Sequence, residues 1–246
     1  MATTGRTASD AVDAGRVASR LREAAFVHLV GRADGAGLAA IGLLADALDA
    51  GGIPHQVSLA KSPGAATARF VDEGTTLALG FDVGDLSVPA GSLAGSAYEI
   101  ASAFDADPDP ILALAGAVAG SNPPAGPAFE AAQEMGVERR PGLGIPVADL
   151  AAGLAYAGRI HASFSGDEQA AGAFLAELEL PADLDTSDRT TLAGAVALEA
   201  TESTPTASTQ AVSDFLAPYD LTSGFETVEG YADVLDALAM TDPGTG

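Results

Sequence analysis

Residues 26–52, FVHLVGRADGAGLAAIGLLADALDAGG, decide the fold of this chain. The run FVHLV at 26–30 is a short apolar segment closed by Gly31, which predicts a buried strand. Residues 37–52 place leucine, isoleucine and alanine at helical spacing and end on two glycines, which predicts a helix and its stop. A second strand is predicted at 55–60. Strand, helix and strand in such a short span form a βαβ unit, so we expect an α/β fold with a parallel sheet.

The rest of the chain extends this unit with one more strand and then with helices. A third strand is predicted at 75–84, and an amphipathic helix at 9–25 precedes the first strand. From residue 91 onward, apolar segments at helical spacing are separated by proline, glycine and aspartate. The helices predicted there are 92–104, 109–120, 127–136, 146–158, 167–180, 187–200 and 225–240. The stretch ESTPTAST at 202–209 has the composition of a linker.

These patterns predict a division of the chain into two domains. The first domain is expected at 1–200, with a sheet part at about 20–90 and a helical part at about 91–200. A second, partial domain is expected at 201–246, after the linker.

The composition is strongly acidic, with 34 acidic residues, 11 basic residues and a formal net charge of −23. Lys61 is the only lysine. A high net charge often accompanies disorder, but 48% hydrophobic residues and a positive mean hydropathy favour a folded chain. At molar salt the Debye length falls to about 3 Å, so the repulsion between surface carboxylates is largely screened. The acidity therefore predicts a haloarchaeal protein from a high-salt cytoplasm.

Several classes of protein are excluded by what the sequence lacks. The 246 residues contain no cysteine, which excludes disulfides, thiolate zinc sites and cysteine nucleophiles. No signal-like apolar core and no run of 18 apolar residues occurs, so we expect a cytoplasmic protein that does not enter the membrane. A Walker A loop and the Tyr-x-x-x-Lys pair of short-chain dehydrogenases both need a lysine, and Lys61 fits neither.

The candidate site lies in the loop between the first strand and its helix. The sequence GRADGAG at Gly31–Gly37 lies between a strand and a helix, where α/β sheets bind their ligands. Its glycines fit either a nucleotide-binding loop, with phosphate at the helix N-terminus, or a plain tight turn. Asp34 in this loop and Asp82 after the third strand would both project from the C-terminal edge of the sheet. Two carboxylates there suit Mg²⁺ or Mn²⁺. The alternative is that Asp34 caps the following helix and Asp82 is a turn residue.

The three histidines add little to this site. His28 lies within the apolar strand, so we expect a buried, hydrogen-bonded imidazole there. His55 follows Pro54 at a strand start and is expected to be structural. His161, beside Arg159 and a loop, is the histidine whose setting most favours a site.

Four stretches carry a resemblance to a known family. Arg32-Ala-Asp34-Gly-Ala36-Gly37-Leu38 follows the first strand, and LALGFDVG (77–84) is a strand that leads to Asp82. HASFSGDEQAAGAFLAELEL (161–180) and GYADVLDALAM (230–240) come later. In this order they resemble the archaeal RecJ-like branch of the DHH phosphoesterase superfamily. Its motifs are His-x-Asp-x-Asp-Gly-[Leu/Ile], a strand ending in Asp, Asp-His-His, and a helix ending in Gly-x-x-x-Asp.

The resemblance implies a sheet of the DHH type, a truncated DHH-associated C-terminal domain and a two-metal hydrolytic site. Of roughly six aspartate and histidine ligands in such a site, Asp34 and Asp82 are kept here. The histidine is replaced by Arg32, the second aspartate by Ala36, and the aspartate of the fourth motif by Gly120 or its neighbour. The Asp-His-His motif is absent.

These losses predict a degenerate site. We expect Arg32 to form an ion pair with Asp34 or Asp82, with no cofactor bound and no DHH-type hydrolysis. The alternative is an active single-strand-specific exonuclease or phosphodiesterase that uses Mn²⁺ or Mg²⁺ at the two aspartates.

The resemblance also implies partners, because inactive RecJ-like proteins accompany GINS in replication. We therefore expect an accessory of DNA replication or repair that acts through protein partners such as GINS. Single-stranded nucleic acid is a further candidate partner, although eleven basic residues provide few phosphate contacts. A second alternative is a truncated paralogue without a function.

Overall fold

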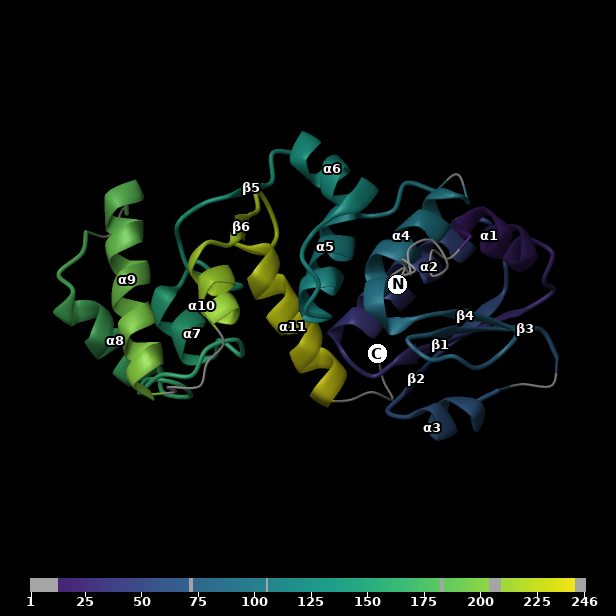
Figure 1. Cartoon of the computed structure of the whole chain (residues 1–246), viewed down its shortest axis with the longest axis horizontal. Coiled ribbons are helices and arrows are strands. Elements are labelled where there is room, and N and C mark those ends of the chain that lie inside the picture. The colour runs from purple at the N-terminus through teal and green to yellow at the C-terminus, as the bar shows by residue number, and fades with distance from the viewer. Residues whose placement is uncertain (1–12, 71–72, 105, 182–183, 204–208, 242–246) are drawn as a thin grey trace, which may run out of the picture.

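The computed structural model shows an α/β protein built on a four-stranded parallel sheet (Figure 1). It describes residues 13–70, 73–104, 106–181, 184–203 and 209–241. The strands are β1 (Val27–Arg32), β2 (His55–Ala60), β3 (Thr75–Leu79) and β4 (Leu86–Val88). Their order across the sheet is β2-β1-β3-β4, and each neighbouring pair is parallel.

The βαβ unit predicted from residues 26–60 is confirmed. β1 leads into α2 (Gly35–Ala50), and β2 pairs with β1 in parallel with Val27 opposite His55. The third strand is shorter than predicted, because it ends at Leu79. Gly80 and Gly84 have positive φ, a backbone conformation that favours glycine and turns the chain out of the strand there. The three-residue strand β4 was not predicted, since it is too short to show a period.

Helices make up most of the remaining chain, as predicted. Before the sheet lies α1 (Ala14–Arg22), and the start of the predicted helix at 9–25 lies outside the described residues. The others are α3 (Pro63–Thr67), η1 (Ala90–Ser92), α4 (Leu93–Ser102), α5 (Pro110–Ala119), α6 (Gly126–Glu134), α7 (Leu150–Ala155), α8 (Glu168–Glu177), α9 (Thr186–Ser203), α10 (Thr209–Leu216) and α11 (Val228–Thr241). The helices α3 and α10 were missed, and residues 204–208 of the predicted linker lie outside the described residues.

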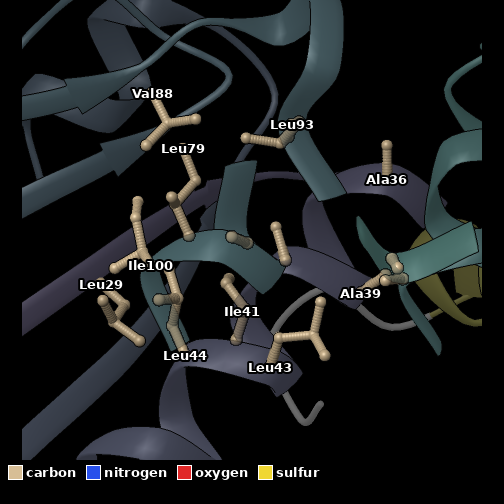
Figure 2. Packing of buried hydrophobic residues seen from close by; sticks show 14 of the residues in the cluster. Leu29, Ala36, Ala39, Ile41, Leu43, Leu44, Leu79, Val88, Leu93 and Ile100 are labelled. Atoms are coloured by element: carbon tan, nitrogen blue, oxygen red, sulfur yellow. The ribbon is translucent and has the colours of Figure 1, made fainter. Parts of the chain in front are cut away.

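The main hydrophobic core lies between one face of the sheet and the helices that cover it (Figure 2). Leu29 of β1 and Leu79 of β3 point into this core, where they meet Leu44 of α2 and Ile100 of α4. Each of these four side chains is fully buried. The opposite face of the sheet is covered by α3, in a smaller cluster that includes Phe81.

A second core forms in the other half of the molecule, around α7 to α10 (Figure 1). The chain enters this half through β5 (Glu138–Arg139) and leaves it through β6 (Tyr219–Asp220), and these two strands pair antiparallel. After β6, α11 returns to the first core, where Val228 and Leu235 pack. Figure 1 shows α11 between the two halves.

The domain boundary predicted near residue 200 therefore falls within a helix, α9, that belongs to the second half. The clusters group residues 143–216 by themselves, while the last helix joins the sheet. Among the described residues, no helix combines the length and the apolar character needed to cross a membrane.

Candidate functional site

The loop after β1 is a tight strand-to-helix turn that Asp34 holds by capping α2. The Asp34 Oδ1 atom accepts a hydrogen bond of 2.9 Å from the Gly37 N–H. A Cβ atom at Gly37 would lie 2.0 Å from the carbonyl oxygen of Arg32, so glycine is required for this close approach. The capping interpretation of Asp34 is thus confirmed.

Arg32 forms the ion pair that the sequence predicted, and its partner is Asp34. The Arg32 Nε–H donates to Asp34 Oδ2, and each side chain is about one third exposed. Both oxygens of the Asp34 carboxylate therefore have a partner within the protein, one a backbone N–H and the other a guanidinium group.

Ala36 and Gly120, the two other positions that the resemblance singled out, lie against each other. A Cβ atom at Gly120, at the end of α5, would lie 3.3 Å from the Cβ atom of Ala36, in the first turn of α2. The structure therefore brings Arg32, Asp34, Ala36 and Gly120 together at the C-terminal edge of the sheet. Neither Ala36 nor Gly120 offers a side-chain oxygen there.

Asp82 lies three residues beyond the end of β3 and is exposed. Its Oδ1 atom accepts a 3.4 Å hydrogen bond from the hydroxyl group of Ser87, which lies in β4. In the part of the chain that the structure describes, no group of three or more histidine, aspartate or glutamate side chains could hold a metal ion. The divalent ion that the two carboxylates would suggest therefore stays a prediction.

The histidines occupy the places that the sequence predicted for His28 and His55. His28 is 1% exposed and its Nε2 atom lies 3.0 Å from Ser58 Oγ. Burial, with a smaller contribution from Arg69, lowers the pKa of His28. The Nδ1 atom of His55 lies 3.2 Å from the carbonyl oxygen of Ile53 at the strand start. His161 is exposed. Its expected role in a site stays a prediction.

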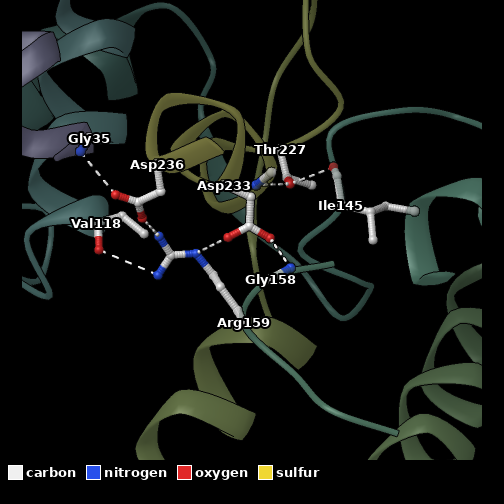
Figure 3. Close-up of polar contacts among 9 residues, drawn as sticks. Gly35, Val118, Ile145, Gly158, Arg159, Thr227, Asp233 and Asp236 are labelled. Atoms are coloured by element: carbon white, nitrogen blue, oxygen red, sulfur yellow. Dashed lines mark hydrogen bonds and ion pairs between the residues drawn. The ribbon is translucent and has the colours of Figure 1, made fainter. Parts of the chain in front are cut away.

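Arg159 is the centre of a polar network that was not predicted from the sequence (Figure 3). Its Nε atom lies 2.9 Å from Asp233 Oδ1 and its Nη2 atom 3.6 Å from Asp236 Oδ2, both on α11. Its Nη1 atom donates to the carbonyl oxygen of Val118 at 3.4 Å. Arg159 therefore joins the segment before α8 to α11 and to α5.

The network continues to the start of α2. Asp236 Oδ1 accepts a 2.9 Å hydrogen bond from the Gly35 N–H, and Asp233 Oδ2 accepts one of the same length from the Gly158 N–H (Figure 3). The N-terminus of a helix has unpaired N–H groups and a partial positive charge, which suit an anion. In α2 this end is satisfied by the protein's own carboxylates, those of Asp34 and Asp236.

Burial raises the pKa of both α11 aspartates. For Asp233, burial is the largest effect, and Arg159 and the Gly158 N–H oppose it. For Asp236, burial is again the largest effect, with the Gly35 N–H and Arg159 opposing it and Asp34 adding to it. One signal of this cluster was present in the sequence, because Asp233 and Asp236 are three residues apart on a predicted helix and so share a face.

A cavity of about 560 Å³ adjoins this network, beside the end of α5. Its lining includes Asn122, Arg139, Arg159, Tyr219 and Glu229. Glu229 is 2% exposed and its Oε2 atom accepts a 2.9 Å hydrogen bond from the Tyr219 N–H. Burial raises the pKa of Glu229 to about 7, although two backbone N–H groups and the two arginines favour its charged form. This cavity and Glu229 were also missed, since β6 and the start of α11 meet only in the fold.

Comparison with protein-family models finds no match for this chain. An uncharacterized protein of Haloarcula marismortui is 43% identical to it over 251 aligned residues. The alignment covers the whole of this chain and 66% of that relative, so the chain spans slightly less than two thirds of the relative's length. A relative from a haloarchaeon agrees with the high-salt origin that the composition predicted.

Proposed function

We propose that this chain is a RecJ-like protein of the DHH type that does not hydrolyse phosphodiesters and acts through protein partners in DNA replication or repair. GINS is the partner class that the resemblance implies. The proposal places the protein in a high-salt cytoplasm, as its composition predicts.

The observation that carries the proposal is the set of contacts among Arg32, Asp34, Ala36 and Gly120. These positions match ligand-bearing positions of two separate motifs of the family, and they meet at one edge of the sheet. Such a meeting is what a DHH-type arrangement requires. The chemistry is different, because one position carries a cation and two carry no donor.

A guanidinium group at this place disfavours a bound metal ion. Two like unit charges about 4 Å apart repel by about 4 kcal/mol at an effective dielectric constant of about 20, and a divalent ion doubles this. The Arg32 side chain is about one third exposed, so molar salt screens part of this repulsion. Arg32 also binds the carboxylate that a metal would need. The positive charge of the Arg32 guanidinium group neutralises the Asp34 carboxylate, as a bound metal ion would.

The end of β4 also supports the loss of hydrolysis. The resemblance expects Asp-His-His after the strand that follows the second motif, and β4 is such a strand. Its last residue is Val88, and the chain continues with Pro89, Ala90 and Gly91, none of which has a metal-binding side chain. Several ligands are therefore lost at once.

A role through protein partners fits the charge of the chain better than a role in binding DNA. The chain has only 11 basic residues, which provide few contacts for phosphate groups. Release of counterions from DNA also contributes little to binding at molar salt. Protein contacts through apolar surface keep their strength under these conditions.

The test is a binding experiment with the intact chain in molar KCl. The chain is immobilised and offered purified GINS subunits from the same host, with an equally acidic haloarchaeal protein as the matched control. We expect GINS to be retained on this chain and not on the control, and labelled single-stranded DNA to pass through. Retention of the DNA without retention of GINS would overturn the partner assignment.

A further inference from the structure

A second cavity, of about 460 Å³, lies in the half of the molecule away from the sheet edge. It is bounded by the start of α9, by residues 142–150 and by residues 220–227. Its volume falls in the range of about 300–1,000 Å³ that is usual for small-molecule sites. It is separate from the cavity beside Arg159, since the two share no lining residue.

The walls of this cavity are held in place by hydrogen bonds that do not depend on a ligand. The Glu226 N–H donates to the carbonyl oxygen of Pro146 at 3.2 Å, and the Leu221 N–H donates to that of Glu226 at 2.9 Å. The Thr227 hydroxyl group donates to the carbonyl oxygen of Ile145 at 2.9 Å and accepts from the Gly230 N–H at 3.0 Å. A site with fixed walls loses little conformational entropy when a ligand binds.

The lining combines an aliphatic surface with charged groups of both signs. The aliphatic part includes Leu143, Ile145, Leu150, Leu184 and Leu192. The charged groups are the guanidinium group of Arg189 and the carboxylates of Asp220 and Glu226. In the described part of the chain no direct ion pair joins Arg189 to either carboxylate, although its charge acts on Asp220.

Asp220 is the partly buried member of this charged set, whereas Arg189 and Glu226 are exposed at the rim of the cavity. Burial raises the pKa of Asp220, Glu226 adds to that effect, and Arg189 and Arg140 oppose it. A purely apolar ligand would remove water from these charges without replacing it, which is unfavourable. A simple anion would face the two carboxylates, and a simple cation would leave Arg189 without a partner.

We propose that this cavity binds a free α-amino acid with an aliphatic side chain. The ammonium group would lie against Asp220 and Glu226, the carboxylate against Arg189, and the alkyl group on Leu143 and Leu192. A zwitterion is the ligand class that pairs charges of both signs while it fills the aliphatic part. This inference goes beyond the proposed role in replication and does not depend on it.

The test is equilibrium dialysis of the full chain against radiolabelled L-leucine in molar KCl. Unlabelled L-leucinamide lacks the carboxylate, N-acetyl-L-leucine lacks the ammonium group, and glycine lacks the alkyl group. We expect saturable binding of L-leucine at millimolar concentration or below, and at least tenfold weaker competition by each of the three analogues. Absence of saturable binding would overturn the proposal. Equal competition by leucinamide would overturn the assignment of Arg189 and point to the amino terminus of a peptide.

Variants connect the binding to this cavity. We expect Arg189→Gln and Asp220→Asn each to weaken leucine binding at least tenfold, and Arg189→Lys to weaken it less than Arg189→Gln. Arg20→Gln, on the exposed face of α1, is the matched control and should bind as the unchanged protein does. Circular dichroism establishes that each variant is folded. Unchanged binding in folded Arg189→Gln and Asp220→Asn would overturn the site.

Discussion

Replacement of Arg159 by methionine tests the network that joins the two halves of the molecule. Methionine keeps part of the aliphatic bulk but removes the guanidinium group. In the variant, Asp233 keeps its hydrogen bond from Gly158 and loses its charge partner at 2.9 Å. Asp236 keeps its hydrogen bond from Gly35.

The expected loss follows from how deeply the pair is buried. Removal of one partner from a buried ion pair typically costs about 3–5 kcal/mol, because the other charge stays behind without compensation. The side chains of Asp233 and Arg159 are 11% and 23% exposed, so the pair is not fully buried. We therefore expect a loss at the lower end of this range, about 3 kcal/mol in the free energy of unfolding near neutral pH. For a chain of this size that corresponds to a fall in Tm of about 6–12 °C.

The assay is thermal and urea unfolding in molar KCl, followed by far-UV circular dichroism. In the double variant Arg159→Met with Asp233→Asn, most of the loss should be recovered because no buried charge remains. The loss in the single variant should also shrink as the pH falls through the raised pKa of Asp233, since protonation removes the charge. Arg140→Met is the control, because its pair with Glu138 is exposed and should not change Tm measurably.

The reasoning would be refuted by a loss below about 1 kcal/mol, the value of a surface pair. It would also be refuted if the double variant were as unstable as the single one.

Three further predictions concern pH, the turn and metal ions. The folded pKa of Glu229 is about 7 and its ordinary value is 4.5, so its contribution to stability is present below pH 4.5 and is lost as the pH rises through 7. Glu229→Gln should therefore raise the free energy of unfolding by about 2–3 kcal/mol at mildly alkaline pH and by little in acid, as urea titrations at both pH values would show. Gly37→Ala should cost about 2–4 kcal/mol because its Cβ would meet the Arg32 carbonyl oxygen, whereas Gly64→Ala, with open space around it, should leave Tm within experimental error. MnCl₂ and EDTA should each leave the melting temperature in molar KCl unchanged, and a rise with Mn²⁺ that Asp34→Ala abolishes would contradict the ion-pair account of Arg32.

The parts of the fold that the sequence predicted depend on local signals. These signals are the apolar run of β1, the helical spacing within α2 and the two glycines that end α2. Each acts over a few residues, so the periodicity of the sequence was sufficient to predict both elements. The cap formed by Asp34 is equally local, because its acceptor and donor are three residues apart. The ion pair of Arg32 spans two residues and could be expected for the same reason.

The parts that were missed depend on contacts between distant segments. Asp236 and Gly35 are 201 residues apart in the chain, and only the return of α11 to the sheet brings them together. Arg159 was noted as a neighbour of His161, yet its partners lie on a helix that begins almost 70 residues later. The contact between Ala36 and Gly120 is of the same kind. An apolar pattern predicts that such helices form but does not say which of their faces meet.

We propose that this sheet edge has the DHH-type arrangement without its hydrolytic chemistry. The most direct measurement is the release of labelled nucleotides from single-stranded DNA by the purified chain, with Mn²⁺ in molar KCl and with Asp82→Ala as the control. The account predicts no release above that of the Asp82→Ala variant. Release that depends on Mn²⁺ and disappears in Asp82→Ala would contradict it and identify the chain as an active phosphodiesterase.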